Sequence, residues 1–332
     1  MQSSRKIFPG KIVVALAMVS GAIPAWTQSC QIGNEIPAPV RTAIESAAQK
    51  TFSQASAGDL NALRASLAPA VKTSFEGIVA AAKDNRAVFA GANRQVRVSF
   101  LLDAGDAPSP DGRFYCGVFG ANGFSGSSTE FDIPGIGAGK YAIVIQDLTS
   151  SASAYALTTI FQEADGWKLA GLYVRPETVA GYDAFWFLDR ARRFKAKGQP
   201  RNAWFYYVTS WDLMAPVKFM DTGLLHKITV ESANVQSEEL PVAGNAVSYS
   251  TPGKTYNLTD MTAIHADNGL DLDVKYSTAN IADLAAAQAD ARRLADALVA
   301  KYPEFKEAFN TLWVHAIDPK GGDVVAMLKL KL

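Results

Sequence analysis

A chain of 332 residues with 48% hydrophobic and 19% charged residues has the composition of an ordinary globular protein. Its length suits two domains better than a single core. The formal net charge of zero, from 32 basic and 32 acidic residues, excludes a strongly basic nucleic-acid-binding chain, so nucleic acid is not an expected partner.

Residues 1–29 carry the features of a secretory signal peptide in their usual order. Three bases, Arg5, Lys6 and Lys11, precede the short apolar run 12–19, and small and polar residues follow it. The run is too short to span a bilayer, and no later stretch reaches the roughly 18 to 20 apolar residues that a spanning helix needs. We therefore expect an exported protein of a bacterial cell envelope, either periplasmic or extracellular, with association with an outer membrane as a further option.

The chain has two cysteines, Cys30 and Cys116, and both lie beyond the predicted signal peptide. An oxidising compartment favours a disulfide between them, which would tie the mature N-terminus to the first domain. The alternative is a lipoprotein in which Cys30 is the lipid-anchored first residue. The preceding Thr27, Gln28 and Ser29 lack the leucine and small residues of a good lipid-attachment signal, so the disulfide is the favoured interpretation.

Residues 38–176 predict a first α+β domain, with helices followed by a strand meander. Asp59 is placed to cap the second helix, and Asp165-Gly166 is typical of a hairpin turn. Helices are expected at 40–57, 60–67 and 71–82, and strands at 96–100, 114–119, 141–148, 155–163 and 167–174.

Two short sequence motifs in this region carry a family resemblance. They are Ala-Gly-Asp-Leu-Asn-Ala-Leu at 57–63 and Asp-Gly-Trp-Lys-Leu-Ala-Gly-Leu at 165–172. With the order of helices and strands, they resemble the nuclear-transport-factor-2-like superfamily of cystatin-like cone folds. The resemblance implies a curved sheet around a long helix with a pocket. Because members include isomerases, cyclases, dehydratases and non-catalytic binders, the resemblance leaves the activity open.

Residues 177–216 predict a helical hairpin that links two domains. Two helical patterns flank the turn Gly198-Gln199-Pro200, and the segment resembles a single tetratricopeptide repeat at Ala191, Phe194, Gly198, Ala203 and Tyr207. One such repeat cannot bury both of its faces alone, so it is expected to pack on a domain.

The same hairpin holds the candidate binding surface, in which basic side chains alternate with aromatic ones. A solvated helix face is the competing interpretation. The candidate ligand- or partner-binding residues are Arg190, Arg193, Lys197, Arg201 and Trp204.

Residues 217–332 predict a second α+β domain, for which we identify no family resemblance. Asn268-Gly269 is the favoured two-residue hairpin turn, and Asn280 is placed to cap a long helix. Strands are expected at 225–235, 261–266, 270–276, 312–317 and 324–330, with a weaker pair of strands within 240–250 that is broken by Gly244-Asn245. The helix is expected at 281–302.

The sequence predicts neither a metal site nor a cofactor. His226, His265 and His315 are all expected on strands, without the spacing of metal ligands. Asp271 and Asp273 share one face of a strand and are expected to face water rather than to bind calcium.

The expected fold is therefore α+β, with two mainly antiparallel sheets packed with helices and joined by the hairpin. The expected function is non-catalytic binding of a partner protein or a small ligand. The alternative is a lyase-like, isomerase-like or hydrolase enzyme whose first-domain pocket uses carboxylates and tyrosines such as Asp147, Tyr155 or Tyr173 for acid–base chemistry.

Overall fold

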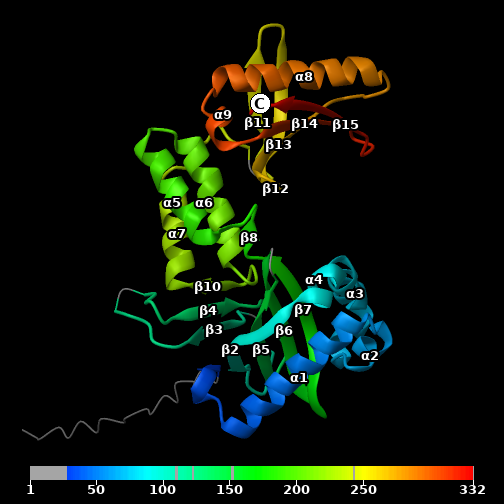
Figure 1. The fold of residues 1–332 in the computed structure, drawn as a ribbon, viewed down its shortest axis with the longest axis vertical. Coiled ribbons are helices and arrows are strands. Elements are labelled where there is room, and N and C mark those ends of the chain that lie inside the picture. The colour runs from blue at the N-terminus through cyan, green and yellow to red at the C-terminus, as the bar shows by residue number, and fades with distance from the viewer. Residues whose placement is uncertain (1–27, 109–110, 122, 151–152, 242–243, 332) are drawn as a thin grey trace, which may run out of the picture.

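The computed structural model describes residues 28–331, apart from 109–110, 122, 151–152 and 242–243. Almost all of the predicted signal peptide, residues 1–27, lies outside the described residues. The fold is α+β, as the sequence predicts, with mainly antiparallel sheets packed against helices. Figure 1 shows the first half of the chain below, three helices in the middle, and the C-terminal sheet with its long helix above.

The first unit is a five-stranded sheet with helices on one face. The strand order is β1-β2-β5-β6-β7, and Asp59 caps α2 as predicted, with Oδ1 accepting from the Ala62 amide at 2.9 Å. The helices are α1 (Ala38–Ala57), α2 (Leu60–Ala65), α3 (Phe75–Asp84) and α4 (Arg86–Gly91), with 3-10 turns at Gly33–Glu35 and Pro69–Ser74. The strands are β1 (Ser29–Ile32), β2 (Asn93–Asp103), β5 (Lys140–Thr149), β6 (Ala154–Ala164) and β7 (Gly166–Pro176).

The central strand β5 is buried on both faces, because alternate side chains of a strand point to opposite sides. One face, with Val144 and Leu148, packs against the helices. The other face, with Ile143 and Ile145, packs against a small second sheet. That small sheet consists of β3 (Arg113–Cys116), β4 (Thr129–Asp132) and β10 (Met220–Thr222), in the order β10-β4-β3.

Strand β10 comes from far along the chain and returns to the first unit. Met220 pairs with Phe131 in an antiparallel register, and the amide of Asp132 donates to the Phe219 carbonyl at 2.9 Å. Three residues are too few to show alternation, so this strand is not predictable from the sequence pattern. The segment 217–222 therefore packs with residues that precede it by almost ninety positions.

The two cysteines form the predicted disulfide, which joins the two sheets of the first unit. Cys30 lies on β1 and Cys116 on β3, with 5.0 Å between their Cα atoms, and the Cys116 side chain is fully buried. Because one sulfur cannot carry both a disulfide and a lipid, the disulfide is the alternative that the structure forms.

Three helices occupy the middle of the molecule. The predicted hairpin is formed by α5 (Ala184–Ala196) and α6 (Pro200–Met214), preceded by the short strands β8 (Thr178–Val179) and β9 (Tyr182–Asp183). The strand predicted at 225–235 is wrong, because this segment forms α7 (Gly223–Ala233), capped by Thr222. Leu225 and Ile228, three residues apart, are buried on one face of α7, so packing overrides the strand propensity of the β-branched residues.

The C-terminal unit is a five-stranded sheet covered by one long helix (Figure 1). The predicted Asn268-Gly269 hairpin is confirmed, but Asp283 rather than Asn280 caps the helix. The second strand of the weaker pair expected within 240–250 corresponds to β11, which begins at Val247. β13 and β14 are parallel because α8 lies between them in the chain. The elements are β11 (Val247–Thr251), β12 (Lys254–Ala266), β13 (Gly269–Ser277), α8 (Leu284–Lys301), α9 (Phe305–Ala308), β14 (Thr311–Ile317) and β15 (Asp323–Lys329).

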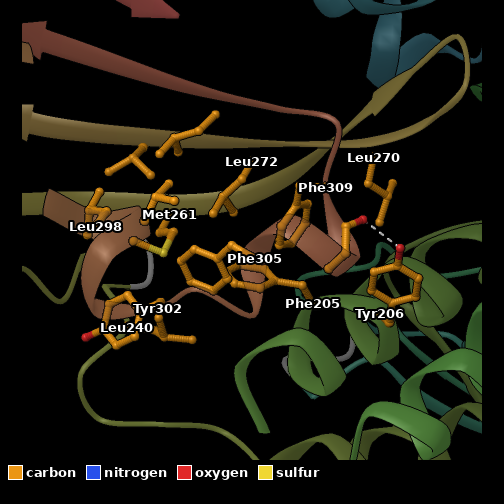
Figure 2. Close-up of a cluster of buried hydrophobic side chains, with 14 of the residues drawn as sticks. Phe205, Tyr206, Leu240, Met261, Leu270, Leu272, Leu298, Tyr302, Phe305 and Phe309 are labelled. Atoms are coloured by element: carbon orange, nitrogen blue, oxygen red, sulfur yellow. Dashed lines mark hydrogen bonds between the residues drawn. The ribbon is translucent and has the colours of Figure 1, made fainter. Parts of the chain in front are cut away.

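The helical hairpin and the C-terminal sheet share one hydrophobic core. Figure 2 shows Phe205 of α6 beside Phe305, the first residue of α9, and Phe309, which directly follows α9. The ring centroid of Phe205 lies 5.5 Å from that of Phe309. Beside it, the hydroxyl of Tyr206 donates to the carbonyl of Ala308 at 2.8 Å (Figure 2). The hairpin is therefore part of the C-terminal core rather than a free linker.

Asp290 of α8 ties the helix to β12 and β13 of the C-terminal sheet. Its carboxylate accepts hydrogen bonds from Lys254, from Tyr256 at 3.0 Å, from Tyr276 at 3.3 Å and from Arg293 at 3.1 Å. Burial alone raises the pKa of Asp290, but the bonds from Lys254 and the two tyrosines outweigh it and hold the pKa below its usual value. Burial and the bond to Asp290 raise the pKa of Tyr256 to about 12.

Replacing Asp290 with asparagine is expected to lower the free energy of unfolding by about 2 kcal/mol at neutral pH, because it removes charge-assisted hydrogen bonds. A carboxyl whose pKa is depressed in the folded state stabilises above its unfolded pKa of about 3.9. This stabilisation is lost as the pH falls through the folded value. Urea unfolding at pH 7 and pH 3 should therefore show a deficit for D290N at pH 7 that shrinks at pH 3.

The control for D290N is D296N on the same helix, whose exposed carboxylate has Arg292 as its one ion-pair partner among the described residues. D296N should change the stability by less than about 0.5 kcal/mol. An equal deficit for D290N at both pH values would contradict the depressed pKa.

Candidate functional site

A groove of about 670 Å³ follows the outer edge of β7, and we call it the β7 groove. Helix α3 and the turn before it form one wall, and the connector 217–219 forms the other. Its floor is the strand segment 170–175, six consecutive residues at the end of the main sheet.

The edge of β7 is covered at its beginning and open farther along. The amide of Leu169 donates to the Ser66 carbonyl, and the amide of Ala68 donates to the Leu169 carbonyl, both at 2.8 Å. From Ala170 to Arg175, the described residues supply no backbone partner on the side away from β6. The change of register at Ala170 is a β-bulge, and it marks where the covered part ends.

The walls of the groove are apolar and belong to opposite faces of the sheet. Val71, Ile78 and Ala81 line the α3 side. On the other side, the rings of Tyr173 and Phe219 meet edge to face, with centroids 5.7 Å apart.

Gly77 lies on the groove side of α3 and has no side chain that would narrow the groove. A Cβ atom built on Gly77 has no heavy atom within 4 Å, so this glycine faces open space.

Two cations lie in the groove, Arg175 at the end of the strand and Lys218 on the connector. Arg175 Nη2 donates to Asp212 Oδ1 at 2.8 Å, whereas its buried Nε has no partner among the described residues. Lys218 is exposed, has no ion pair among the described residues, and also lines two neighbouring hollows of about 250 and 320 Å³.

No Asp, Glu or His is among the described residues that line the groove. Burial raises the pKa of Tyr173, so its hydroxyl is neutral at physiological pH. The groove therefore combines apolar walls with positive charge.

Two of the candidate basic residues on the hairpin form ion pairs with the C-terminal half of the chain. Lys197 Nζ lies 2.8 Å from Glu307 Oε2. Arg201 pairs with Glu304 at 3.4 Å and with Glu239, and it lies over the ring of Tyr302. These contacts stabilise the packing of the hairpin on α9.

The other three candidate residues also have contacts within the chain. Arg190 lies over the ring of Trp186, 5.6 Å from its centroid, and Arg193 pairs with Asp189 at 2.8 Å on the surface of α5. Trp204 is half-buried against the core that the hairpin shares with the C-terminal sheet. All five candidates therefore have contacts within the described part of the chain.

The residues considered for acid–base catalysis do not converge. Tyr155 packs on the helix-covered face of the main sheet. Asp147 lies on the opposite face, because Leu148 beside it packs on the helices, and it pairs with Arg97. Only Tyr173 lines the β7 groove.

The prediction that Asp271 and Asp273 face water is wrong. They are only 8% and 7% exposed, because β14 pairs in parallel with their strand and covers them. Trp313 Nε1 donates to Asp271 Oδ2 at 2.9 Å, and His315 Nε2 lies 2.9 Å from Asp273 Oδ1. Among the described residues, no group of three or more His, Cys, Asp or Glu side chains is arranged to hold a metal ion.

The histidines occupy two kinds of element. His265 and His315 lie on strands as predicted, but His226 lies on α7, where its ring stacks on Phe124 with centroids 4.8 Å apart. Burial lowers the pKa of His265.

No protein-family model, curated protein sequence or solved structure matches this chain. In the part of the chain that the structure describes, no helix has both the length and the apolar character needed to cross a membrane. The candidate site therefore depends on the geometry of the β7 groove alone.

Proposed function

We propose that this is an exported, non-catalytic binding protein of the cell envelope whose ligand occupies the β7 groove. The observation that carries the proposal is the groove itself, a hollow of about 670 Å³ with apolar walls and two cations. Its volume is typical of sites that take a small organic ligand or a short peptide.

The lining residues favour binding over acid–base catalysis. General acid–base chemistry needs a carboxylate, a histidine or a similar group within hydrogen-bond reach of the substrate. The described lining residues that titrate are Tyr173, Arg175 and Lys218. Tyr173 has a raised pKa, and Arg175 pairs with Asp212. This set suits an amphipathic ligand that has an apolar body and a negative group.

Export is supported by two independent features. The leader 1–29 has the order of a signal peptide. The disulfide between Cys30 and Cys116 is of the kind that persists in oxidising compartments outside the cytoplasm.

The test uses the full chain expressed in a bacterium and purified from the periplasmic fraction, with the leader removed. Anilinonaphthalene sulfonate, an apolar fluorophore with a negative group, is the probe. We expect it to bind wild type with an increase in fluorescence, and G77L to weaken binding at least tenfold, because leucine fills the open space beside Gly77. K218A should weaken binding several-fold at low salt, because it removes an attractive charge.

Two features of this design separate binding from folding. Leucine is a better helix former than glycine by about 1 kcal/mol, so G77L should not lower the melting temperature. G91L is the matched control, because Gly91 at the end of α4 also faces open space but lies away from the groove. Equal binding to wild type and G77L, or a protein retained with its leader in the cytoplasm, would overturn the proposal.

A further inference from the structure

We propose that the ligand of the β7 groove is an extended peptide segment of a partner protein, which pairs with β7 as an additional strand of the main sheet. This inference rests on the proposed function and identifies the class of its ligand. The segment would have apolar residues at alternate positions and at least one acidic residue.

The strand that forms the floor of the groove has an open backbone edge. An edge strand presents unpaired amide and carbonyl groups, and strand addition is a common way to satisfy them. Here the open part runs from Ala170 to Arg175, which is about 20 Å of strand. The bulge at Ala170 and the strand end at Pro176 limit pairing to this short stretch.

The groove has two walls, one on each face of the sheet. Successive side chains of a strand point to opposite faces, so an added strand would direct alternate side chains to each wall. One set would contact Val71 and Ile78, and the other would contact Tyr173 and Phe219. Both walls are apolar, which predicts apolar residues on both faces of the incoming segment.

The charged side chains of the groove favour an acidic residue in the incoming segment. Arg175 has one carboxylate partner, Asp212, and a buried Nε without a partner, whereas Lys218 has no ion pair among the described residues. A carboxylate of the incoming segment would complement this positive charge, whereas a basic side chain at the same position would be repelled. A neutral, purely apolar ligand would supply no negative partner for Lys218, whereas Arg175 already pairs with Asp212.

The walls also decide between a peptide and a second copy of this chain. Edge-to-edge pairing of two whole sheets requires both edges to approach without obstruction. Helix α3 and the connector 217–219 flank the open edge on its two faces, which leaves room for a single strand. A segment extended from a partner meets this requirement, and pairing of two β7 edges does not.

The experiment begins with a random octapeptide library displayed on phage and selected on wild-type protein, with G77L used to remove peptides that bind elsewhere. We expect selected peptides to have apolar residues at alternate positions and an Asp or Glu. The most enriched peptide is then synthesised, together with a version that is N-methylated at alternate amides. N-methylation removes backbone donors but keeps every side chain, so we expect it to weaken binding at least tenfold.

Hydrogen exchange of the full chain with the bound peptide provides the structural readout. We expect slower exchange for backbone amides in residues 170–175 and little change in the C-terminal sheet. K218A should weaken peptide binding and reduce its dependence on salt. Equal affinity of the N-methylated peptide, or protection elsewhere in the chain, would overturn strand addition.

The remaining outcomes distinguish this inference from the proposed function. If no peptide is selected but the fluorophore still binds wild type and not G77L, the groove binds a small molecule and the peptide inference fails alone. If the fluorophore instead binds wild type and G77L equally, both proposals fail. Self-association of wild type that is abolished by G77L, measured by sedimentation, would replace the peptide with a second copy of the chain.

Discussion

Replacing Phe205 with alanine is expected to lower the free energy of unfolding by about 3 to 5 kcal/mol, in the part of the chain that contains the hairpin and the C-terminal sheet. The Phe205 ring is 1% exposed and has ring contacts with Trp204, Phe305 and Phe309. Its removal leaves a cavity at the point where α6 meets α9. The collapse of such a site is limited when all its neighbours are large and packed.

Urea unfolding monitored by circular dichroism and by tryptophan fluorescence measures this loss. Trp186, Trp204 and Trp211 report on the hairpin, and Trp313 reports on the C-terminal sheet. Because the core is shared, we expect all these signals to shift together. F185A on α5 is the control, since Phe185 is 61% exposed and its loss should cost less than about 1 kcal/mol. A hairpin that unfolds separately in F205A, with the sheet unchanged, would contradict the shared core.

Removal of the disulfide by the double substitution C30S and C116S is expected to cost about 4 to 5 kcal/mol. The cysteines are 86 positions apart, and the chain-entropy model assigns this range to a loop of that length. The loss of stability should be confined to the first unit, because the bond joins β1 of the main sheet to β3 of the small sheet.

Trp167 on β7 reports the stability of the first unit, because it is the tryptophan of that unit among the described residues. The midpoint of its fluorescence change in urea should fall in the double variant, and in wild type after reduction, by the same amount. The C-terminal transition should be unaffected. A loss below about 1 kcal/mol would mean that the packing of Phe100 on Phe131, with ring centroids 4.9 Å apart, holds the two sheets together without the bond.

Local features of the fold were predictable from the sequence. The Asp59 cap, the Asp165-Gly166 hairpin and the Asn268-Gly269 hairpin each depend on a few adjacent residues, and each is present. The disulfide followed from the presence of two cysteines and the expected compartment.

Features that depend on distant partners were not predictable. The helix α7 and the burial of Asp271 are set by packing against α6 and β14, which alternation along one segment does not report. Much of the groove was missed for the same reason. Tyr173 was considered as a pocket residue, but Ile78 and Phe219, more than a hundred positions apart, come together only through the fold.

The return of β10 to the first unit affects the order in which the parts of the chain complete their folding. The small sheet lacks its third strand until residues 220–222 have emerged, so the first unit is completed only after both helices of the hairpin have been made. Because synthesis starts at the N-terminus, Cys30 and Cys116 emerge well before that strand, and their oxidation can precede its docking. A cut at 176 or at 216 therefore releases a fragment without β10 and without the connector wall of the groove. A cut after 222 keeps both.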